Sequence, residues 1–200
     1  MNPYDDEKMV RVQQEFCAMF YKGAKKRLGI FGINPGRLGA GITGIPFTDP
    51  KTLKEKCHIH SLDQTGGELS SEFIYTVIER LGGLPTFYRQ FYLGSVCPLG
   101  LLSEKRNANY YDNTQLATLL RPWIAECMKA QIQMGLRTDA AVVLGTGKNA
   151  RYFNSLNDQF SWFKEIHVLD HPRYIMQYKR KHVTGYQKIY RDLLTRLQDI

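Results

Sequence analysis

The stretch Arg27–Gly36, R-L-G-I-F-G-I-N-P-G, places a short apolar run directly before a turn. Its first part, Arg27–Ile33, has the length and apolar content of one buried strand. Asn34, Pro35 and Gly36 favour a turn, because these residue types adopt the backbone conformations that end regular structure. We therefore predict a β-strand that ends near Ile33 and leads into a polar loop.

Three further apolar runs also end in turn-forming residues. They are Phe91–Val96 before Pro98, Ala140–Leu144 before Gly145-Thr146-Gly147, and Glu165–Leu169 before Asp170-His171-Pro172. Apolar residues at helical spacing predict helices over residues 7–20, 70–81, 113–134, 148–154 and 182–197. We expect Ser70 or Ser71 to cap the second helix and Asn113 or Thr114 the third, with Pro122 as an awkward break inside it.

Short strands that alternate with helices indicate a parallel sheet covered by helices on both faces. The predicted fold is therefore α/β, a three-layer α/β/α sandwich around a central, mainly parallel four-stranded sheet. A length of 200 residues without repeats or linkers indicates one domain over residues 1–200. In such sheets ligands bind outside the carboxyl ends of the strands, so we expect the four turns to form the site.

Composition and charge exclude several classes of protein. A hydrophobic share of 43% and a charged share of 23% are typical of globular chains, not of disordered, collagen-like or coiled-coil ones. No apolar run reaches the roughly 18 residues of a membrane-spanning helix, and the N-terminal residues resemble no signal or transit peptide. Four scattered cysteines indicate reduced thiols, so we expect a cytoplasmic protein without membrane contact.

Two short motifs have more than one interpretation. The glycine turn L-G-T-G-K-N at residues 144–149 lacks a Walker A pattern, because Val142 and Asn149 replace the required Gly and Ser or Thr. A tight turn or a phosphate contact at Gly147 and Lys148 remains open. Cys57-His58-x-His60 suggests metal ligands, but without a second cluster we favour a polar loop. It lies in the long segment Arg37–Asp63, which we expect to be a functional loop.

The segment Arg173–His182, R-Y-I-M-Q-Y-K-R-K-H, mixes cations with aromatic and apolar residues. Cations neutralise phosphates, and apolar side chains wedge between stacked bases. The alternative is a solvated turn before the last helix. Residues 171–200 contain seven Lys or Arg and two Asp, so much of the net charge of +8 follows the last strand end. This position favours contact with nucleic acid.

Three motifs carry a resemblance to a known family. They are Gly32–Gly36 (G-I-N-P-G) with Thr43–Phe47 (T-G-I-P-F), Ser95–Leu99 (S-V-C-P-L), and His171-Pro172. They resemble the uracil-DNA glycosylase superfamily, and most closely its single-strand-selective monofunctional branch, in a bacterial form with altered second and third motifs. That branch has G-M-N-P-G with T-G-V-P-F, then N-x-C-P-L, then H-P-S-P-R. The resemblance spans about residues 28–175.

The resemblance implies a role for each matching residue. Asn34 would position the attacking water, and His171 would hydrogen-bond the uracil O2 as negative charge develops. Ile33 would offer its backbone to the base edge, and Phe47 would stack on the base. Gly36 stands where a thymine-excluding branch has Tyr, so we expect room for small substituents at C5 of the base.

The departures from the family motifs also carry expectations. Ser95 replaces the base-reading Asn, and its hydroxyl rotates to donate or accept, so we expect looser base choice that includes xanthine or hypoxanthine. Because Arg173 replaces a Ser and a later Pro-Arg is absent, the duplex wedge must be built differently. Asp170 precedes His171, but neighbours along a strand point to opposite faces, so we expect no direct contact. The expected DNA-contacting residues are Arg173, Tyr174, Met176, Lys179, Arg180, Lys181, Gly147 and Lys148.

The resemblance thus implies a monofunctional DNA glycosylase of base excision repair that removes uracil and related deaminated or C5-modified bases. It implies no metal or organic cofactor, and no lyase step because the three motifs contain no lysine nucleophile. We expect a monomer in the bacterial cytosol or nucleoid, acting on single-stranded DNA or on a duplex with a flipped base. Two alternatives stay open: a non-catalytic nucleic-acid-binding protein of the same fold, and an α/β hydrolase of free nucleosides or nucleotides.

Overall fold

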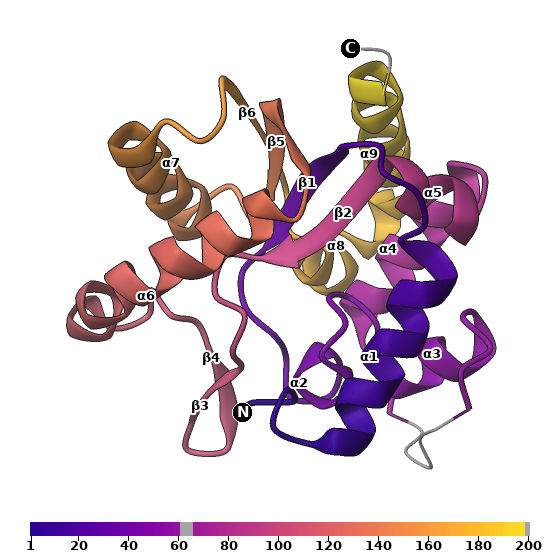
Figure 1. Ribbon diagram of the computed structural model, residues 1–200, viewed down its shortest axis with the longest axis horizontal. Coiled ribbons are helices and arrows are strands. Elements are labelled where there is room, and N and C mark those ends of the chain that lie inside the picture. The colour runs from indigo at the N-terminus through magenta and orange to yellow at the C-terminus, as the bar shows by residue number, and fades with distance from the viewer. Residues whose placement is uncertain (61–65, 199–200) are drawn as a thin grey trace.

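The computed structural model describes residues 1–60 and 66–198, and a four-stranded sheet lies at its centre (Figure 1). The strands are β1 (Arg27–Gly32), β2 (Phe91–Ser95), β5 (Leu136–Leu144) and β6 (Glu165–Leu169). Their order is β2-β1-β5-β6, and every neighbouring pair is parallel. All four predicted strands and the parallel sheet are confirmed.

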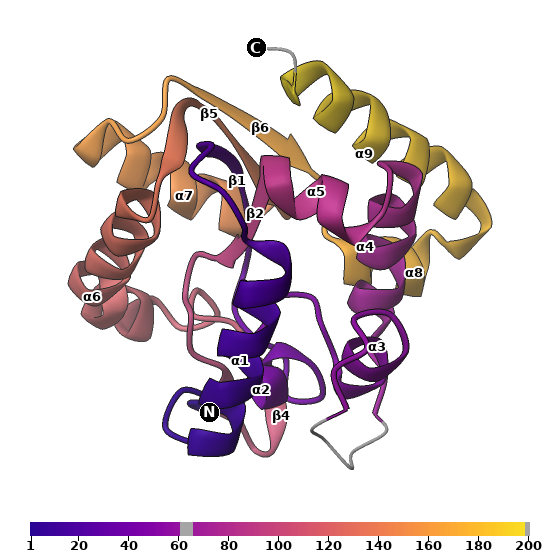
Figure 2. The ribbon, with the colours of Figure 1, turned by 45° about the vertical axis from the view of Figure 1, so that its right-hand side comes forward.

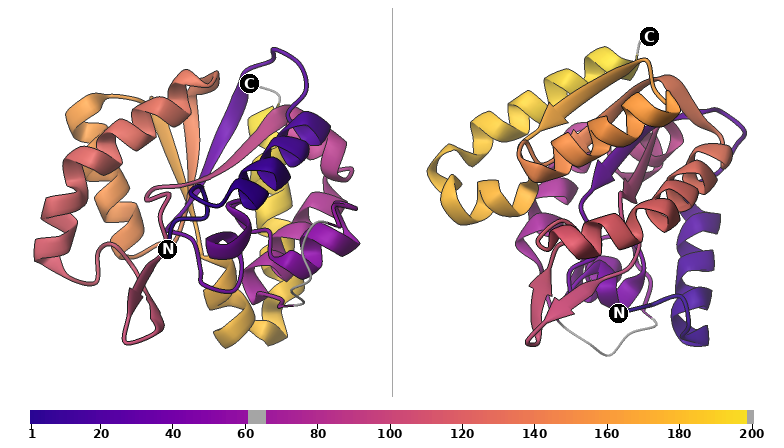
Figure 3. Two further views of the ribbon diagram at one scale, coloured as in Figure 1. Left: turned by 60° about the horizontal axis from the view of Figure 1, so that its bottom comes forward. Right: turned by 90° about the vertical axis from the view of Figure 1, so that its left-hand side faces the viewer.

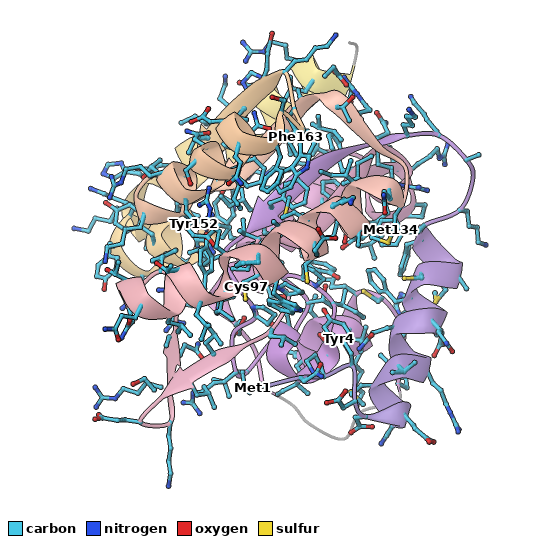
Figure 4. The ribbon with its side chains drawn as sticks, turned by 60° about the vertical axis from the view of Figure 1, so that its left-hand side comes forward. Met1, Tyr4, Cys97, Met134, Tyr152 and Phe163 are labelled. Atoms are coloured by element: carbon cyan, nitrogen blue, oxygen red, sulfur yellow. The ribbon has the colours of Figure 1, made fainter. Side chains whose placement is uncertain are left out.

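Helices cover both faces of the sheet, as the left view of Figure 3 shows. One layer contains α1 (Glu7–Phe20), α4 (Leu69–Arg80), α5 (Leu84–Gln90), α8 (Pro172–Tyr178) and α9 (Val183–Gln198), and the other contains α6 (Thr114–Gln133) and α7 (Lys148–Phe160) (Figure 2). Strand residues alternate between the layers, so Ile30 joins the first core and Phe31 the second. Cys97 and Phe163 also belong to the second core (Figure 4). The α/β/α sandwich is therefore confirmed.

Several helix ends differ from the prediction. Helix α4 begins at Leu69 with Glu68 at the N-cap position, so the expected caps at Ser70 and Ser71 are wrong. Helix α6 is capped by Asn113 as predicted, and it continues through Pro122 to Gln133. Helix α7 extends to Phe160 rather than residue 154, because buried residues continue along the face that it packs on the sheet.

Seven of the described elements were not anticipated, among them α5. The expected loop at residues 37–63 contains α2 (Ala40–Thr43) and α3 (Pro50–Glu55), while its last residues, 61–63, lie outside the described part of the chain. Instead of an open turn, the basic stretch forms α8 and the 3₁₀ helix η1 (Arg180–His182). A hairpin of β3 (Leu101–Ser103) and β4 (Arg106–Ala108), which projects from the body in Figure 1, lacks the apolar alternation of a buried strand.

The strand order sets where a ligand binds. Strand β1 pairs with β2 on one side and with β5 on the other. The chain therefore adds β2 on one side of β1 and then places β5 and β6 on the opposite side, so the strand order reverses between β1 and β5. Such a switch point opens a crevice at the carboxyl ends of the two strands where the order reverses, here β1 and β5. Among the described helices, none is both long and apolar enough to cross a membrane.

Candidate active site

A cavity of about 930 Å³ lies at the carboxyl ends of the strands. Each of the four predicted turns contributes to its wall, through Asn34, Ser95, Gly145 and His171. The other expected site residues that line it are Ile33, Gly36, Phe47, Gly147, Lys148, Arg173 and Tyr174. The fold thus brings together residues that are up to about 140 positions apart in the sequence.

Asn34 follows β1, and its amide oxygen is a hydrogen-bond acceptor that no described protein group uses. Its Nδ2 donates to the Ala108 carbonyl at 3.1 Å, which fixes the orientation of the amide. Its Oδ1 is buried and has no hydrogen-bond partner among the described residues. A buried acceptor without a partner costs about 1–3 kcal/mol, so such atoms in native proteins point to a functional use.

His171 caps α8 and presents a donor. Its Nδ1 accepts from the Arg173 backbone N–H at 3.2 Å, so the neutral ring carries its proton on Nε2. Burial and the nearby Arg173 charge lower the pKa of His171 to about 4. Asp170 is engaged elsewhere, because its Oδ1 accepts from the Thr146 hydroxyl at 3.1 Å. The imidazole is therefore a neutral hydrogen-bond donor at physiological pH.

Phe47 forms part of the cavity wall and of the core. Its side chain is only 9% exposed, and its ring centroid lies 6.0 Å from that of His171. The ring packs so closely on Gly32 that a Cβ there would lie 2.7 Å from it. Phe47 also has a φ of 56°, an uncommon value for a bulky residue that is typically found where function constrains the backbone.

Gly36 has no side chain, and the Glu68 side chain fills the space beside it, a contact that sequence reasoning did not predict. A Cβ on Gly36 or on Gly39 would overlap the carboxyl group of Glu68, which lines the same cavity. Burial raises the pKa of Glu68, and a hydrogen bond from Ser70 and the Arg173 charge oppose that rise. The space beside Gly36 is therefore bounded by a carboxyl group.

Two polar residues of the cavity wall are buried. Ser95 is 8% exposed, and its carbonyl accepts from Gln131 Nε2 at 3.1 Å. Asn149 receives the Tyr110 hydroxyl on Oδ1 at 2.7 Å and donates from Nδ2 to the Leu144 carbonyl at 2.9 Å. Sequence reasoning missed Asn149 as a residue of the cavity wall, although it belongs to the glycine-turn motif at residues 144–149.

Gly147 and Lys148 line the cavity, and the expected DNA contacts in and after α8 divide into three groups. Arg173 and Tyr174 are exposed and line the cavity. Lys179, Arg180 and Lys181 follow α8 and lie outside the cavity wall. The expectation for Met176 is wrong, because its side chain is 5% exposed and packs in the core on the inner face of α8. A DNA strand has no access to it.

The possible metal motif is divided between core and surface. Cys57 is buried with its Sγ 3.2 Å from the Tyr75 hydroxyl, whereas His58 and His60 are exposed. Burial raises the pKa of the Cys57 thiol to about 11. Within residues 1–60 and 66–198 no three His, Cys, Asp or Glu side chains are grouped to hold a metal ion.

Comparison with known proteins gives the family. Residues 19–194 match the family described as the uracil DNA glycosylase superfamily. The chain belongs to this superfamily. Over its full length it is similar to the crystal structure of wild-type SMUG2 from Pedobacter heparinus, with 39% sequence identity, a TM-score of 0.95 and 88% of that chain covered. A search of curated proteins finds no match. Superfamily membership supports a glycosylase function of the uracil-DNA glycosylase type and DNA as the partner.

Proposed function

We propose that the chain is a monofunctional DNA glycosylase that hydrolyses the bond between a deaminated base and its deoxyribose. One observation carries the proposal: the free acceptor of Asn34 and the neutral donor of His171 line one cavity at the switch point of the sheet. Hydrolysis of this bond needs both functions, an acceptor for the attacking water and a donor for the departing base.

The chemistry divides between these two residues. The C1′–N bond breaks, and the base keeps the electron pair while positive charge develops on the sugar. His171 Nε2–H donates to the base carbonyl oxygen as it gains negative charge. Asn34 Oδ1 accepts a hydrogen bond from water, which attacks C1′ and transfers a proton by way of solvent to the base. An amide is a weak base, so Asn34 acts by orienting the water.

The other cavity residues support recognition of the base. Phe47 stacks on the base, a contact of about 1–3 kcal/mol, and the Ile33 backbone faces its polar edge. The Ser95 hydroxyl adapts to bases with different donors and acceptors, so the proposed substrates include xanthine and hypoxanthine beside uracil. Arg173, Tyr174, Lys148 and the three basic residues after α8 contact the DNA.

The test is cleavage of oligonucleotides that each contain one uracil, xanthine or hypoxanthine, followed by alkaline strand scission. We expect Asn34→Ala and His171→Ala to lower the rate at saturating enzyme by about 100-fold or more. Asn154→Ala and His60→Ala, at exposed positions outside the cavity, are matched controls with the wild-type rate. Binding of DNA without any cleavage would instead support a non-catalytic nucleic-acid-binding protein.

A further inference from the structure

The β3–β4 hairpin, residues 101–108, is an element for which the preceding mechanism has no role beyond one hydrogen bond. Its strands pair antiparallel, with Ser103 opposite Arg106, and Glu104 and Lys105 form the connecting turn. Both turn residues have positive φ, 49° and 61°, as a tight two-residue hairpin turn requires. Residues 102–107 are exposed, so the hairpin is a regular element that buries little surface of its own.

The hairpin reaches the catalytic cavity. Arg106 and Asn107 line the cavity wall together with Asn34 and His171. Figures 1 and 2 show the hairpin apart from α8, and residues of both elements line the cavity, so the two elements border the cavity at different places. A DNA strand that enters the cavity beside α8 must therefore also pass the hairpin.

Its charges suit a polyanion. Lys105 and Arg106 are exposed, and among the described residues neither forms an ion pair, even with the adjacent Glu104. Arg37, which follows β1, also lines the cavity and is likewise unpaired in the described part of the chain. Exposed cations without protein partners at the mouth of a cavity attract backbone phosphates.

Two hydrogen bonds connect the hairpin to the segment Asn34–Arg37. The Ala108 carbonyl of β4 accepts from Asn34 Nδ2 at 3.1 Å, and Asn107 Oδ1 accepts from the Arg37 backbone N–H at 2.9 Å. The hairpin therefore holds the Asn34 side chain and the backbone of the residue that follows its turn. Because the amide is held through its Nδ2, its Oδ1 is left to face the cavity.

We propose that residues 101–108 form a DNA-binding arm, in which Lys105 and Arg106 contact backbone phosphates and β4 holds Asn34 in its reactive orientation. The proposal rests on the proposed function for its choice of DNA as the ligand. It adds a second contact surface across the cavity from α8 and connects binding at that surface to the position of the water-orienting residue.

The binding role is tested with Lys105→Asn/Arg106→Gln, since Asn accepts the positive φ at residue 105 and keeps the hairpin folded. The probe is a fluorescent oligonucleotide with one uracil, as a single strand and in a duplex, over a series of salt concentrations. We expect weaker binding and a salt dependence of log Kd that is shallower by about one unit for each cation removed. The control Lys25→Gln/Lys26→Gln removes the same charge before β1, at the opposite end of the sheet, and keeps the wild-type slope. Wild-type affinity and slope in the arm variant would overturn the binding role.

The positioning role is tested with Asn107→Ala, which removes the side-chain oxygen that accepts the hydrogen bond from the Arg37 backbone N–H. We expect a single-turnover rate several-fold lower at saturating enzyme with an unchanged salt slope, and recovery in Asn107→Asp, which keeps an acceptor oxygen. An unchanged rate in Asn107→Ala overturns this role.

If the wild type binds DNA but cleaves none of the bases, the proposed function fails, while the binding comparison still decides whether residues 101–108 form a DNA-binding arm. If the wild type binds no DNA, both proposals fail.

Discussion

Asn34 and His171 illustrate how the polarity of single atoms sets what a site can do. Each has one hydrogen-bonding atom committed to the protein backbone and a second one left for the cavity. The committed atom fixes the orientation of the amide and the tautomer of the imidazole. One residue therefore offers only an acceptor and the other only a donor, which matches the two charges that separate during glycosidic cleavage.

The lowered pKa of His171 predicts a pH dependence of stability. The unfolded chain binds a proton on this residue below about pH 6.5, whereas the folded chain binds it only below about pH 4. The free energy of unfolding should therefore rise as the pH rises from about 4 to about 6.5 and then become level. Urea unfolding at a series of pH values should show a smaller rise for His171→Asn, which keeps a capping acceptor on α8. Parallel curves for the two proteins would contradict the lowered pKa.

Glu68 predicts a substrate preference. If the base C5 faces Gly36, as the Tyr of the thymine-excluding branch suggests, a C5 hydroxymethyl group meets the Glu68 carboxyl group and donates to it. Leaving a buried hydrogen-bonding group without its partner costs about 1–3 kcal/mol. We expect Glu68→Leu to lower cleavage of hydroxymethyluracil relative to uracil roughly tenfold, while Glu68→Gln keeps most of the preference. Equal reductions on both substrates would show that Glu68 has no part in base choice.

Among the elements, those that sequence reasoning missed are all short, with seven residues or fewer. The hairpin is short and buries little, so its formation depends on partners elsewhere, as the hydrogen bond from Asn34 to Ala108 shows. Helix α8 is short, and the basic residues that follow it concealed its buried face at Ile175 and Met176. Strands β1 and β2 and the second half of β5 were predictable because continuous burial selects continuous apolar runs.

A buried hydrogen bond between Tyr110, which follows β4, and Asn149 of α7 predicts how a substitution changes the free energy of unfolding. Tyr110 and Asn149 are both buried, and the tyrosine hydroxyl donates to Asn149 Oδ1 at 2.7 Å. Tyr110→Phe leaves that oxygen buried without its donor, so we expect the free energy of unfolding to fall by about 1–3 kcal/mol. Urea denaturation is the measurement, and Tyr111→Phe, at a half-buried neighbour, is the control with a smaller effect. A decrease no larger than that of the control would mean that the hydroxyl contributes nothing.

Over the whole molecule, the positive charge is distributed unevenly about the sheet. Arg37, Arg106, Lys148 and Arg173 surround the cavity, and none of them forms an ion pair within the described residues. Lys22, Lys25 and Lys26 instead precede β1, at the amino ends of the strands. The two groups therefore lie at opposite ends of the parallel strands, and only the first is placed to contact DNA at the cavity.

Lys179, Arg180 and Lys181 directly follow Tyr178, which lines the cavity, so they add to the positive charge at that end of the sheet. We expect Lys179→Gln/Arg180→Gln/Lys181→Gln to weaken DNA binding and to flatten its salt dependence by about one unit for each phosphate that the variant no longer neutralises. The triple variant Lys22→Gln/Lys25→Gln/Lys26→Gln removes the same charge and should bind as the wild type does. Fluorescence anisotropy over a salt series measures both. Equal effects of the two variants would indicate a response to net charge alone.

The sequence by itself determined the sheet, most helices and the four turns that meet at its edge. Each of these rests on a local signal, because apolar periodicity and turn-forming residues act over a few neighbours. It also placed Asn34 and His171 in the site, since both stand directly at strand ends. That residues 1–200 form one domain stays a prediction of this kind.

Only the tertiary structure decided which groups surround those two residues. Glu68 beside Gly36, Asn149 beneath Tyr110, and the hairpin against Asn34 are contacts between residues from 32 to 74 positions apart. The burial of Met176 was decided in the same way, by packing of α8 on the core. The physical reason is that burial, hydrogen-bond satisfaction and pKa depend on the atoms that packing brings near, whichever part of the chain supplies them.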